Sequence, residues 1–384
     1  MSRQVYADNA ATTRPSKRAV AAMLPWLEEG YGNPSSVYRQ GQEARRAVEA
    51  ARGQVARALG ARPGEIFFTS GGTESDNWAL KGTVKALAAQ GKVHLVTTVF
   101  EHHAVLHSAR ALEREGCAVT YLPVSRDGFV SPRQVAGAIR GDTALVSVMY
   151  ANNEIGTLQP VEEIASVCRE RGVLFHTDAV QAAGHLPIDV RAQGMDLLSL
   201  SAHKFHGPKG VGALYVRRDI PFPVSHMDGG GQERGRRAGT ENVAGIVGTG
   251  AALQEASAGL EERAFRLASM RDRLIRGLLR LPDTRLNGHP TRRLPGNANL
   301  SFAGVDGKEL LFLLDKAGIA ASTGSACSAG SQEPSHVLAA IGLSPQLAGG
   351  SLRLTLGDMN TMDDVEYLLA AIPPIVRRLR GRRA

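Results

Sequence analysis

Short apolar runs rich in β-branched residues alternate with helical patterns between about residue 60 and residue 220, and this alternation limits the fold more than any other feature of the sequence. Strands that alternate with helices of about 10 to 15 residues predict βαβ units and a mostly parallel sheet. Several runs are apolar on both faces, as a sheet covered by helices on both sides requires. The predicted strands are 65–70, 92–99, 118–124, 143–150, 173–178, 195–201 and 211–217.

The pattern changes after residue 250, where a long Arg- and Leu-rich helical stretch runs to about residue 281 and mixed helices and strands follow. A chain of 384 residues is long enough for two domains. We therefore predict an N-terminal segment, 1–14, that packs with the small domain, a large α/β domain over 15–255, and a smaller α+β domain over 256–384.

Charge and cysteine content exclude several classes of protein. The formal net charge of +8 is partly concentrated in residues 375–384, which read as a solvated basic tail, and no aromatic-interleaved basic face accompanies it. Three cysteines without CxxC spacing argue against a disulfide framework and a zinc ribbon. The apolar runs are too short to span a bilayer, and the N-terminus lacks the layout of a signal peptide. We expect a cytoplasmic protein without membrane or direct nucleic-acid contact.

Ligands of open α/β sheets bind beyond the carboxyl ends of the strands, and a glycine-rich turn follows the predicted strand 65–70. Gly71 and Gly72 lead into Thr73, and Asp76 comes three residues later, which is a helix N-cap pattern. Unobstructed backbone N–H groups at a helix start can bind phosphate. An ordinary strand–helix turn would show the same pattern.

Three more polar groups follow predicted strands. Asp178 ends one strand, with Gln181 just beyond it, and Lys204 follows another. A lysine at a strand end beside hydroxyl and imidazole groups is a candidate Schiff-base residue, although a surface lysine in a Gly-Pro turn is the alternative, which suits Lys209 better. His203 and His206 are three apart, but no third metal ligand lies near them in sequence. The remaining polar residues at these strand ends are Asn152, Asn153 and Ser201.

These groups match the requirements of pyridoxal 5'-phosphate. Its chemistry needs an amine, a carboxylate that keeps the pyridine nitrogen protonated, and a helix N-terminus that holds the phosphate. Lys204, Asp178 and the Gly72–Thr73 pair supply those three parts.

Several motifs resemble the cysteine desulfurases, pyridoxal phosphate enzymes of fold type I in the class V aminotransferase superfamily. The most specific are "SAHKFHGPKG" at 201–210 and "TGSACSAGSQEPSHVL" at 323–338. The resemblance is greatest to the group typified by the nitrogen-fixation and iron–sulfur-cluster enzymes. It extends over nearly the whole chain, from "YADNAATT" at 6–13 to "SLRLTLG" at 351–357.

The resemblance implies roles at matching positions. Lys204 is similar to the lysine that forms a Schiff base with the cofactor, and His102, rather than the adjacent His103, to the histidine stacked on its ring. Asp178 would pair with the pyridine nitrogen and Gln181 with the phenolic oxygen. The residues that the resemblance implies to hold the phosphate are Thr73, Ser201 and His203, in addition to Gly72 at the helix start.

The remaining implied roles concern the substrate and a second subunit. Asn153 and Arg353 would bind the carboxylate of L-cysteine, for which arginine offers a bidentate geometry. Thr240 resembles a threonine that reaches the phosphate of the neighbouring subunit's cofactor, which implies a homodimer.

Cys327 resembles the catalytic cysteine of this family. Its thiolate would attack the sulfur of cofactor-bound cysteine, keep that sulfur as a persulfide and release alanine. The surrounding small residues predict a surface loop that can carry the persulfide to a sulfur-acceptor protein, such as an iron–sulfur scaffold or a thiolation enzyme. Cys168 continues the apolar spacing of a predicted helix and Cys117 stands at the entry to the predicted strand 118–124, so both are expected to be structural.

Other functions stay open on the sequence. The same fold could serve a selenocysteine lyase or another class V aminotransferase or lyase, and a transaminase would have no use for Cys327. A non-catalytic scaffold or RNA-binding subunit is a further alternative, against which the full set of cofactor residues argues.

Overall fold

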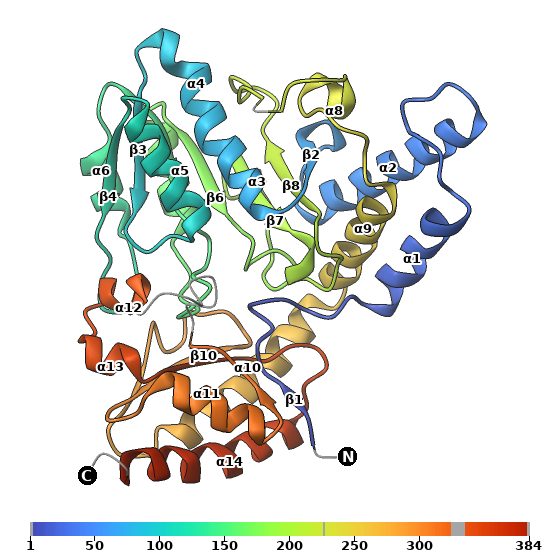
Figure 1. Ribbon diagram of the computed structural model, residues 1–384. Helices are drawn as coiled ribbons and strands as arrows, with labels where there is room; N and C mark the ends of the chain where they lie inside the picture. Colours follow the sequence, from blue (N-terminus) through green and yellow to red (C-terminus); the bar gives the residue numbers. More distant parts are fainter. Residues whose placement is uncertain (1–2, 226, 324–334, 382–384) are drawn as a thin grey trace.

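The computed structural model describes residues 3–225, 227–323 and 335–381 (Figure 1). A seven-stranded sheet within these residues has the order β2-β8-β7-β6-β5-β3-β4. Its strands are β2 (Ile66–Thr69), β3 (His94–Thr98), β4 (Ala118–Leu122), β5 (Thr143–Ser147), β6 (Leu174–Asp178), β7 (Leu197–Ser201) and β8 (Gly212–Val216).

The mostly parallel sheet predicted from the sequence is confirmed. β3 pairs in parallel with β4 and β5, and β6 pairs in parallel with β5 and β7. β8 is antiparallel to both β7 and β2, so one edge departs from the βαβ pattern. A connection of ten residues, 202–211, joins β7 to β8, which is too short for a crossover helix and returns the chain antiparallel.

Helices cover both faces of this sheet, because alternate residues of its strands enter different apolar cores. Val96 and Val146 pack in the core formed with α2 (Arg39–Ala58), α7 (Val161–Glu170) and α9 (Val243–Ser257). Their neighbours Leu95 and Leu145 pack in a second core with α4 (Thr83–Leu87) and α5 (His103–Arg114).

A smaller part of the chain has its own sheet and its own core (Figure 1). β10 (Asn297–Phe302) lies between β12 (Ser351–Thr355) and β9 (Thr284–Leu286), antiparallel to both. β1 (Val5–Tyr6) pairs in parallel with β11 (Ile319–Ala320) beside them. The helices around this core are α10 (Leu260–Leu278), α11 (Gly307–Lys316) and α14 (Met362–Gly381). The domain limits at residues 14 and 255 stay a prediction.

Two predictions from the sequence are wrong in part. The helical stretch 250–281 is two helices, because α9 ends at Ser257 and α10 begins at Leu260 after Gly259, which has a φ of 66°. The basic tail has Arg377 and Arg378 exposed, as expected, but it is helical as far as Gly381 and packs on the small domain. Val376 and Leu379 are buried there, and Arg380 donates to the carbonyl oxygens of Ala303, Pro282 and Asp283.

The remaining helices and helical turns complete the described chain. They are α1 (Lys17–Glu28), η1 (Pro63–Glu65), α3 (Gly72–Asn77), the π-helical turn η2 (Trp78–Gly82), η3 (Ala88–Gln90), α6 (Pro132–Ala138), η4 (Ala202–Lys204), α8 (Gln232–Gly235), α12 (His336–Ala340) and α13 (Pro345–Gly349). No helix among the described residues is long and apolar enough to cross a membrane.

Candidate active site

A cavity of about 580 Å³ lies beyond the carboxyl ends of β6 and β7, where open α/β sheets bind ligands. Most residues proposed from the sequence line it. These residues are Gly72, Thr73, His102, Asn153, Asp178, Gln181, Ser201, His203, Lys204 and Arg353.

Two proposed residues are not among those that line this cavity. Thr240 is exposed on the segment between α8 and α9. Cys327 lies outside the described residues, in the interval 324–334.

Lys204 ends η4, the short turn that follows β7, and its amine faces a segment from the start of the chain. Nζ donates to the carbonyl oxygen of Ala10 over 2.7 Å and to that of Ala11 over 2.8 Å. Gln181 donates from Nε2 to the Ala10 carbonyl over 3.0 Å. Residues 10 and 11 therefore hold the lysine amine at the cavity wall.

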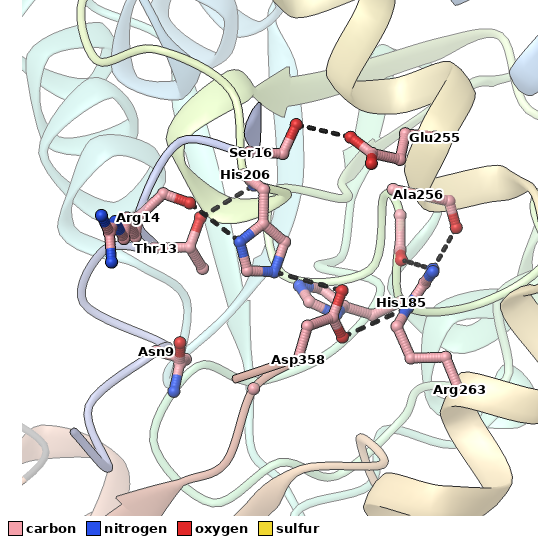
Figure 2. Close-up of polar contacts among 12 residues, drawn as sticks. Asn9, Thr13, Arg14, Ser16, His185, His206, Glu255, Ala256, Arg263 and Asp358 are labelled. Carbon is pink, nitrogen blue, oxygen red and sulfur yellow. Dashed lines mark hydrogen bonds and ion pairs between the residues drawn. The ribbon is translucent and has the colours of Figure 1, made fainter. Parts of the chain in front are cut away.

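A set of polar contacts fixes the turn that carries Lys204, and Figure 2 draws those of His206. His185 donates from Nε2 to the Lys204 carbonyl oxygen over 2.9 Å. His206 has a φ of 65°, which is uncommon for a residue with a side chain. It donates from Nδ1 to the Arg14 carbonyl oxygen over 2.9 Å, and its Nε2 lies 3.6 Å from Asp358 Oδ2 (Figure 2). Contacts from two distant segments thus hold the lysine-bearing turn.

Asp178, at the end of β6, is a buried carboxyl group in the cavity wall. Burial raises its pKa to about 6, although the Val180 N–H, 2.9 Å from Oδ1, and the positive charge of Lys204 both oppose that rise. A cationic partner in the cavity would keep this carboxyl group ionised, and a protonated pyridine nitrogen is such a partner.

Two further buried residues lie beside Asp178. Both ring nitrogens of His176 are hydrogen-bonded. Nδ1 pairs with Ser147 Oγ over 2.9 Å and Nε2 with Ser199 Oγ over 3.0 Å. Burial lowers its pKa to about 3, so the ring is neutral. Asp76 Oδ1 is 3.7 Å from His176 Nε2, and burial together with repulsion from Asp178 raises the Asp76 pKa well above its usual value.

The helix-capping pattern that the sequence indicated is wrong in its residues. The N-cap of α3 is Gly71, with a φ of 153° that only glycine adopts readily, and Thr73 is the second helical residue. Asp76 does not cap the helix but is buried within it. The side chain that bonds back at this helix start is Glu74, whose Oε2 accepts from the Ser70 N–H over 2.7 Å.

The start of α3 leaves room for a ligand because its first residues have no side chains. A Cβ atom on Gly72 would lie 2.5 Å from Val180 Cγ2, and one on Gly71 would lie 3.6 Å from Ser201 Oγ. The helix continues through η2 into α4, so its first N–H groups begin a long helical run. Together with the hydroxyl groups of Thr73 and Ser201, these N–H groups form a concave wall that suits an anionic group.

His102 caps α5, since its Nδ1 accepts from the Ala104 N–H over 3.1 Å. Its Nε2 then carries the proton of the neutral ring. Burial, and next the positive charge of Lys204, lower the His102 pKa to about 4. A neutral imidazole therefore lines the cavity at pH 7, whereas His103 is not among the lining residues.

Arg353 brings a buried cation to the cavity from β12. Its Nη2 donates to Asp8 Oδ1 over 2.8 Å and its Nη1 to the Asn153 carbonyl oxygen over 3.1 Å. Nε has no hydrogen-bond partner among the described residues, although it is buried.

The sequence did not reveal the contribution of residues 8–11 to this site. Asp8, Ala10 and Ala11 contact Arg353 and Lys204 through hydrogen bonds that span more than half of the chain. It also gave no role to Glu74, which lines the cavity. The motif "YADNAATT" includes these residues, but Ala10 and Ala11 act through backbone oxygens, so their side chains give no sign of the contact.

Comparison with known proteins identifies the family. The family model described as Aminotransferase class-V matches residues 5–368. The chain belongs to the class V aminotransferase family. This family depends in general on pyridoxal phosphate, and the α/β architecture agrees with fold type I.

Individual relatives match over nearly their full length. A protein named cysteine desulfurase IscS from Methanosarcina thermophila is 55% identical over 98% of this chain and 93% of its own length. One of the same name from Clostridium botulinum is 52% identical over 99% of this chain and 96% of its own length. A solved structure titled NifS-like protein superposes with a TM-score of 0.91 at 40% identity, covering 98% of this chain and 99% of that one.

Proposed function

We propose that this protein is a pyridoxal phosphate-dependent cysteine desulfurase, which converts L-cysteine to L-alanine and captures the sulfur as a persulfide on Cys327. The observation that carries the proposal is one cavity that joins an amine, a buried carboxyl group and a buried arginine: Lys204, Asp178 and Arg353. The names of relatives with more than half of their residues identical support the choice of reaction.

The residues present fit the cofactor. Lys204 would hold it covalently, Asp178 would face its pyridine nitrogen, and His102 would lie against its ring. Gln181 would face the phenolic oxygen, and the start of α3 with Ser201 and His203 would hold its phosphate. When bound, pyridoxal phosphate supplies an electron-accepting ring that makes bonds at the substrate α- and β-carbons easier to break.

The chain's own residues orient the substrate. The Arg353 guanidinium and the Asn153 side chain would bind the cysteine carboxylate. The Lys204 amine can move a proton at the α-carbon, since a lysine that has released its covalent partner is a base next to that atom. His102 presents a neutral ring with a proton on Nε2, from which it can donate to a developing negative charge.

Cys327 would supply the nucleophile. Its thiolate attacks the substrate sulfur, the carbon–sulfur bond of L-cysteine breaks, and the electron pair of that bond returns to carbon with a proton to give L-alanine. The products are alanine and a Cys327 persulfide, so atoms and electrons balance without another oxidant or reductant. The other cysteines suit this role poorly, because burial raises the pKa of both thiols, that of Cys168 to about 12.

The proposal extends to the assembly and its partners. Thr240, which is exposed, would reach the phosphate of the partner subunit's cofactor in a homodimer. The persulfide would pass to an iron–sulfur scaffold or a tRNA-thiolation enzyme in the cytoplasm.

The decisive experiment quantifies alanine and sulfide together after incubation with L-cysteine and a reductant. Equal amounts of both products, lost in Cys327→Ala and kept in the matched variant Cys117→Ala, would support the proposal. Sulfide release by Cys327→Ala at the wild-type rate would contradict the persulfide step. Pyruvate in place of alanine would indicate a β-eliminating lyase. If Cys327→Ala released alanine faster from L-selenocysteine than from L-cysteine, the protein would be a selenocysteine lyase.

A further inference from the structure

An acidic residue, Glu74, lines the cavity at the place proposed for the cofactor phosphate. Glu74 follows Thr73 in the first turn of α3 and lines the same cavity as Thr73, Ser201 and His203. Its side chain is only 10% exposed, so water does little to screen its charge. An anion in this position disfavours a second anion unless a cation compensates for it.

Arg237 supplies that cation from another part of the chain. Its Nε donates to Glu74 Oε1 over 2.8 Å and its Nη2 to Glu74 Oε2 over 3.1 Å, which is a bidentate pair. Burial alone would raise the Glu74 pKa, but the hydrogen bonds from Arg237 and Ser70 outweigh it and hold the pKa below its usual value. The carboxylate is thus ionised and paired.

The segment that carries Arg237 is held by a second, fully buried pair. Arg52 donates from Nη1 to Glu233 Oε2 over 2.7 Å and from Nη2 to Glu233 Oε1 over 2.9 Å. Glu233 also accepts from the Phe68 N–H over 3.1 Å, and its φ of 45° is left-handed. Because these contacts fix an unfavourable backbone at Glu233, the residues that follow it have a defined path toward α3.

Thr240 lies three residues beyond Arg237 on the same segment. The Arg237–Glu74 pair therefore joins the start of α3 to the segment that also carries Thr240, the residue proposed to reach the partner subunit's cofactor. Glu233 and Glu241 also lie near Arg237 and favour its charged form, but its hydrogen bonds go to Glu74.

We propose that Arg237 is a positioning residue of the phosphate site, which neutralises Glu74 so that this wall of the cavity accepts a phosphate group. The inference rests on the proposed function, since it assigns the phosphate to pyridoxal phosphate. It concerns binding of the cofactor rather than turnover of the substrate.

The test measures the dissociation constants of pyridoxal phosphate and of pyridoxal, which lacks the phosphate, by absorbance titration of the purified protein freed of cofactor. Arg237→Ala should weaken pyridoxal phosphate binding at least tenfold and change pyridoxal binding less than twofold. The double variant Glu74→Gln with Arg237→Ala should return to within about threefold of the wild type. Arg236→Ala is the matched control, because it removes the same charge from a neighbouring arginine whose guanidinium lies over the Phe222 ring.

The outcomes separate the alternatives. Equal losses of both ligands, or a double variant as weak as Arg237→Ala, would mean that the pair only stabilises the fold and would overturn the inference. If Arg237→Ala does not fold, Glu74→Gln alone tests the inference. This variant should bind pyridoxal phosphate at least as tightly as the wild type, and weaker binding would contradict the inference. A wild type that binds no pyridoxal phosphate would refute the proposed function itself.

Discussion

The Arg353 guanidinium donates from Nη2 to Asp8 Oδ1 over 2.8 Å, so a residue near the start of the chain fixes an arginine near its end. Nη1 is used by the Asn153 carbonyl oxygen, and Nε is the buried nitrogen without a hydrogen-bond partner among the described residues. The orientation of the guanidinium is therefore set before any ligand binds, which lowers the entropic cost of binding a carboxylate.

Replacement of Arg353 should weaken substrate binding more than it alters the cofactor. We expect Arg353→Ala to raise the KM for L-cysteine at least tenfold with an unchanged cofactor absorption spectrum, because a buried carboxylate loses its charged partner, worth roughly 1.5 to 3 kcal/mol. The KM of Arg353→Lys should lie between those of the wild type and Arg353→Ala, since lysine keeps the charge and loses the planar geometry. Arg273→Ala, which breaks an exposed pair with Glu366, is the control. An unchanged KM in Arg353→Ala would remove Arg353 from the substrate site.

The identity of the covalent lysine can be tested without turnover. Borohydride reduction of protein loaded with pyridoxal phosphate, followed by peptide mass spectrometry, should find the adduct on Lys204, whose Nζ faces the cavity and the Ala10 carbonyl. Lys204→Ala should give no adduct. Lys209→Ala should still form the Lys204 adduct. It is the matched control, because Lys209 is exposed and lines the same cavity. An adduct on Lys209 would show that we chose the wrong lysine.

Local patterns predicted the sheet because they report burial. The run "KVHLVTTV" places Leu95 and Val96 on opposite faces, each in its own core, and a strand apolar on both sides has few other solutions. The antiparallel direction of β8 was not predicted, since a run of β-forming residues has no sign of direction.

The missing parts of the site depend on contacts between distant parts of the chain. Asp8 and Arg353 are 345 residues apart, and Lys204 bonds to backbone oxygens of two alanines. No periodicity encodes such pairs, because they form only when the whole fold is complete. The left-handed φ of His206 was equally hidden, since histidine seldom adopts it and a glycine stands next to it.

The start of α3 should be intolerant of a methyl group. A Cβ atom on Gly72 would meet Val180 Cγ2 at 2.5 Å, so one wall of the cavity must shift. We expect Gly72→Ala to weaken pyridoxal phosphate binding at least tenfold. Gly137→Ala in α6 is the matched control, because its Cβ meets nothing within 4 Å. That change should leave affinity unaltered and raise the free energy of unfolding by about 0.5 to 1 kcal/mol. Equal affinity in Gly72→Ala and the wild type would mean that the wall adapts.

Glu101 should make the stability of the protein depend on pH. It is fully buried, with Oε1 accepting from Thr98 Oγ1 and the Met149 N–H, and burial raises its pKa to about 8. The folded state therefore holds a proton that the unfolded state releases near pH 4.5. The protonated Glu101 stabilises the fold fully below pH 4.5, and this stabilisation is lost progressively as the pH rises from 4.5 through about 8.

Urea unfolding at pH 6 and at pH 8.5 can isolate this effect through the variant Glu101→Gln. The wild type should lose up to about 1.4 kcal/mol per pH unit relative to the variant over this range, since one proton is involved. The variant keeps the oxygen that accepts from Thr98 and Met149 and lacks the titrating proton. Any pH-independent effect of the substitution on stability cancels when the two pH values are compared. Parallel pH dependences in the two proteins would show that Glu101 ionises in the folded state as readily as in the unfolded chain.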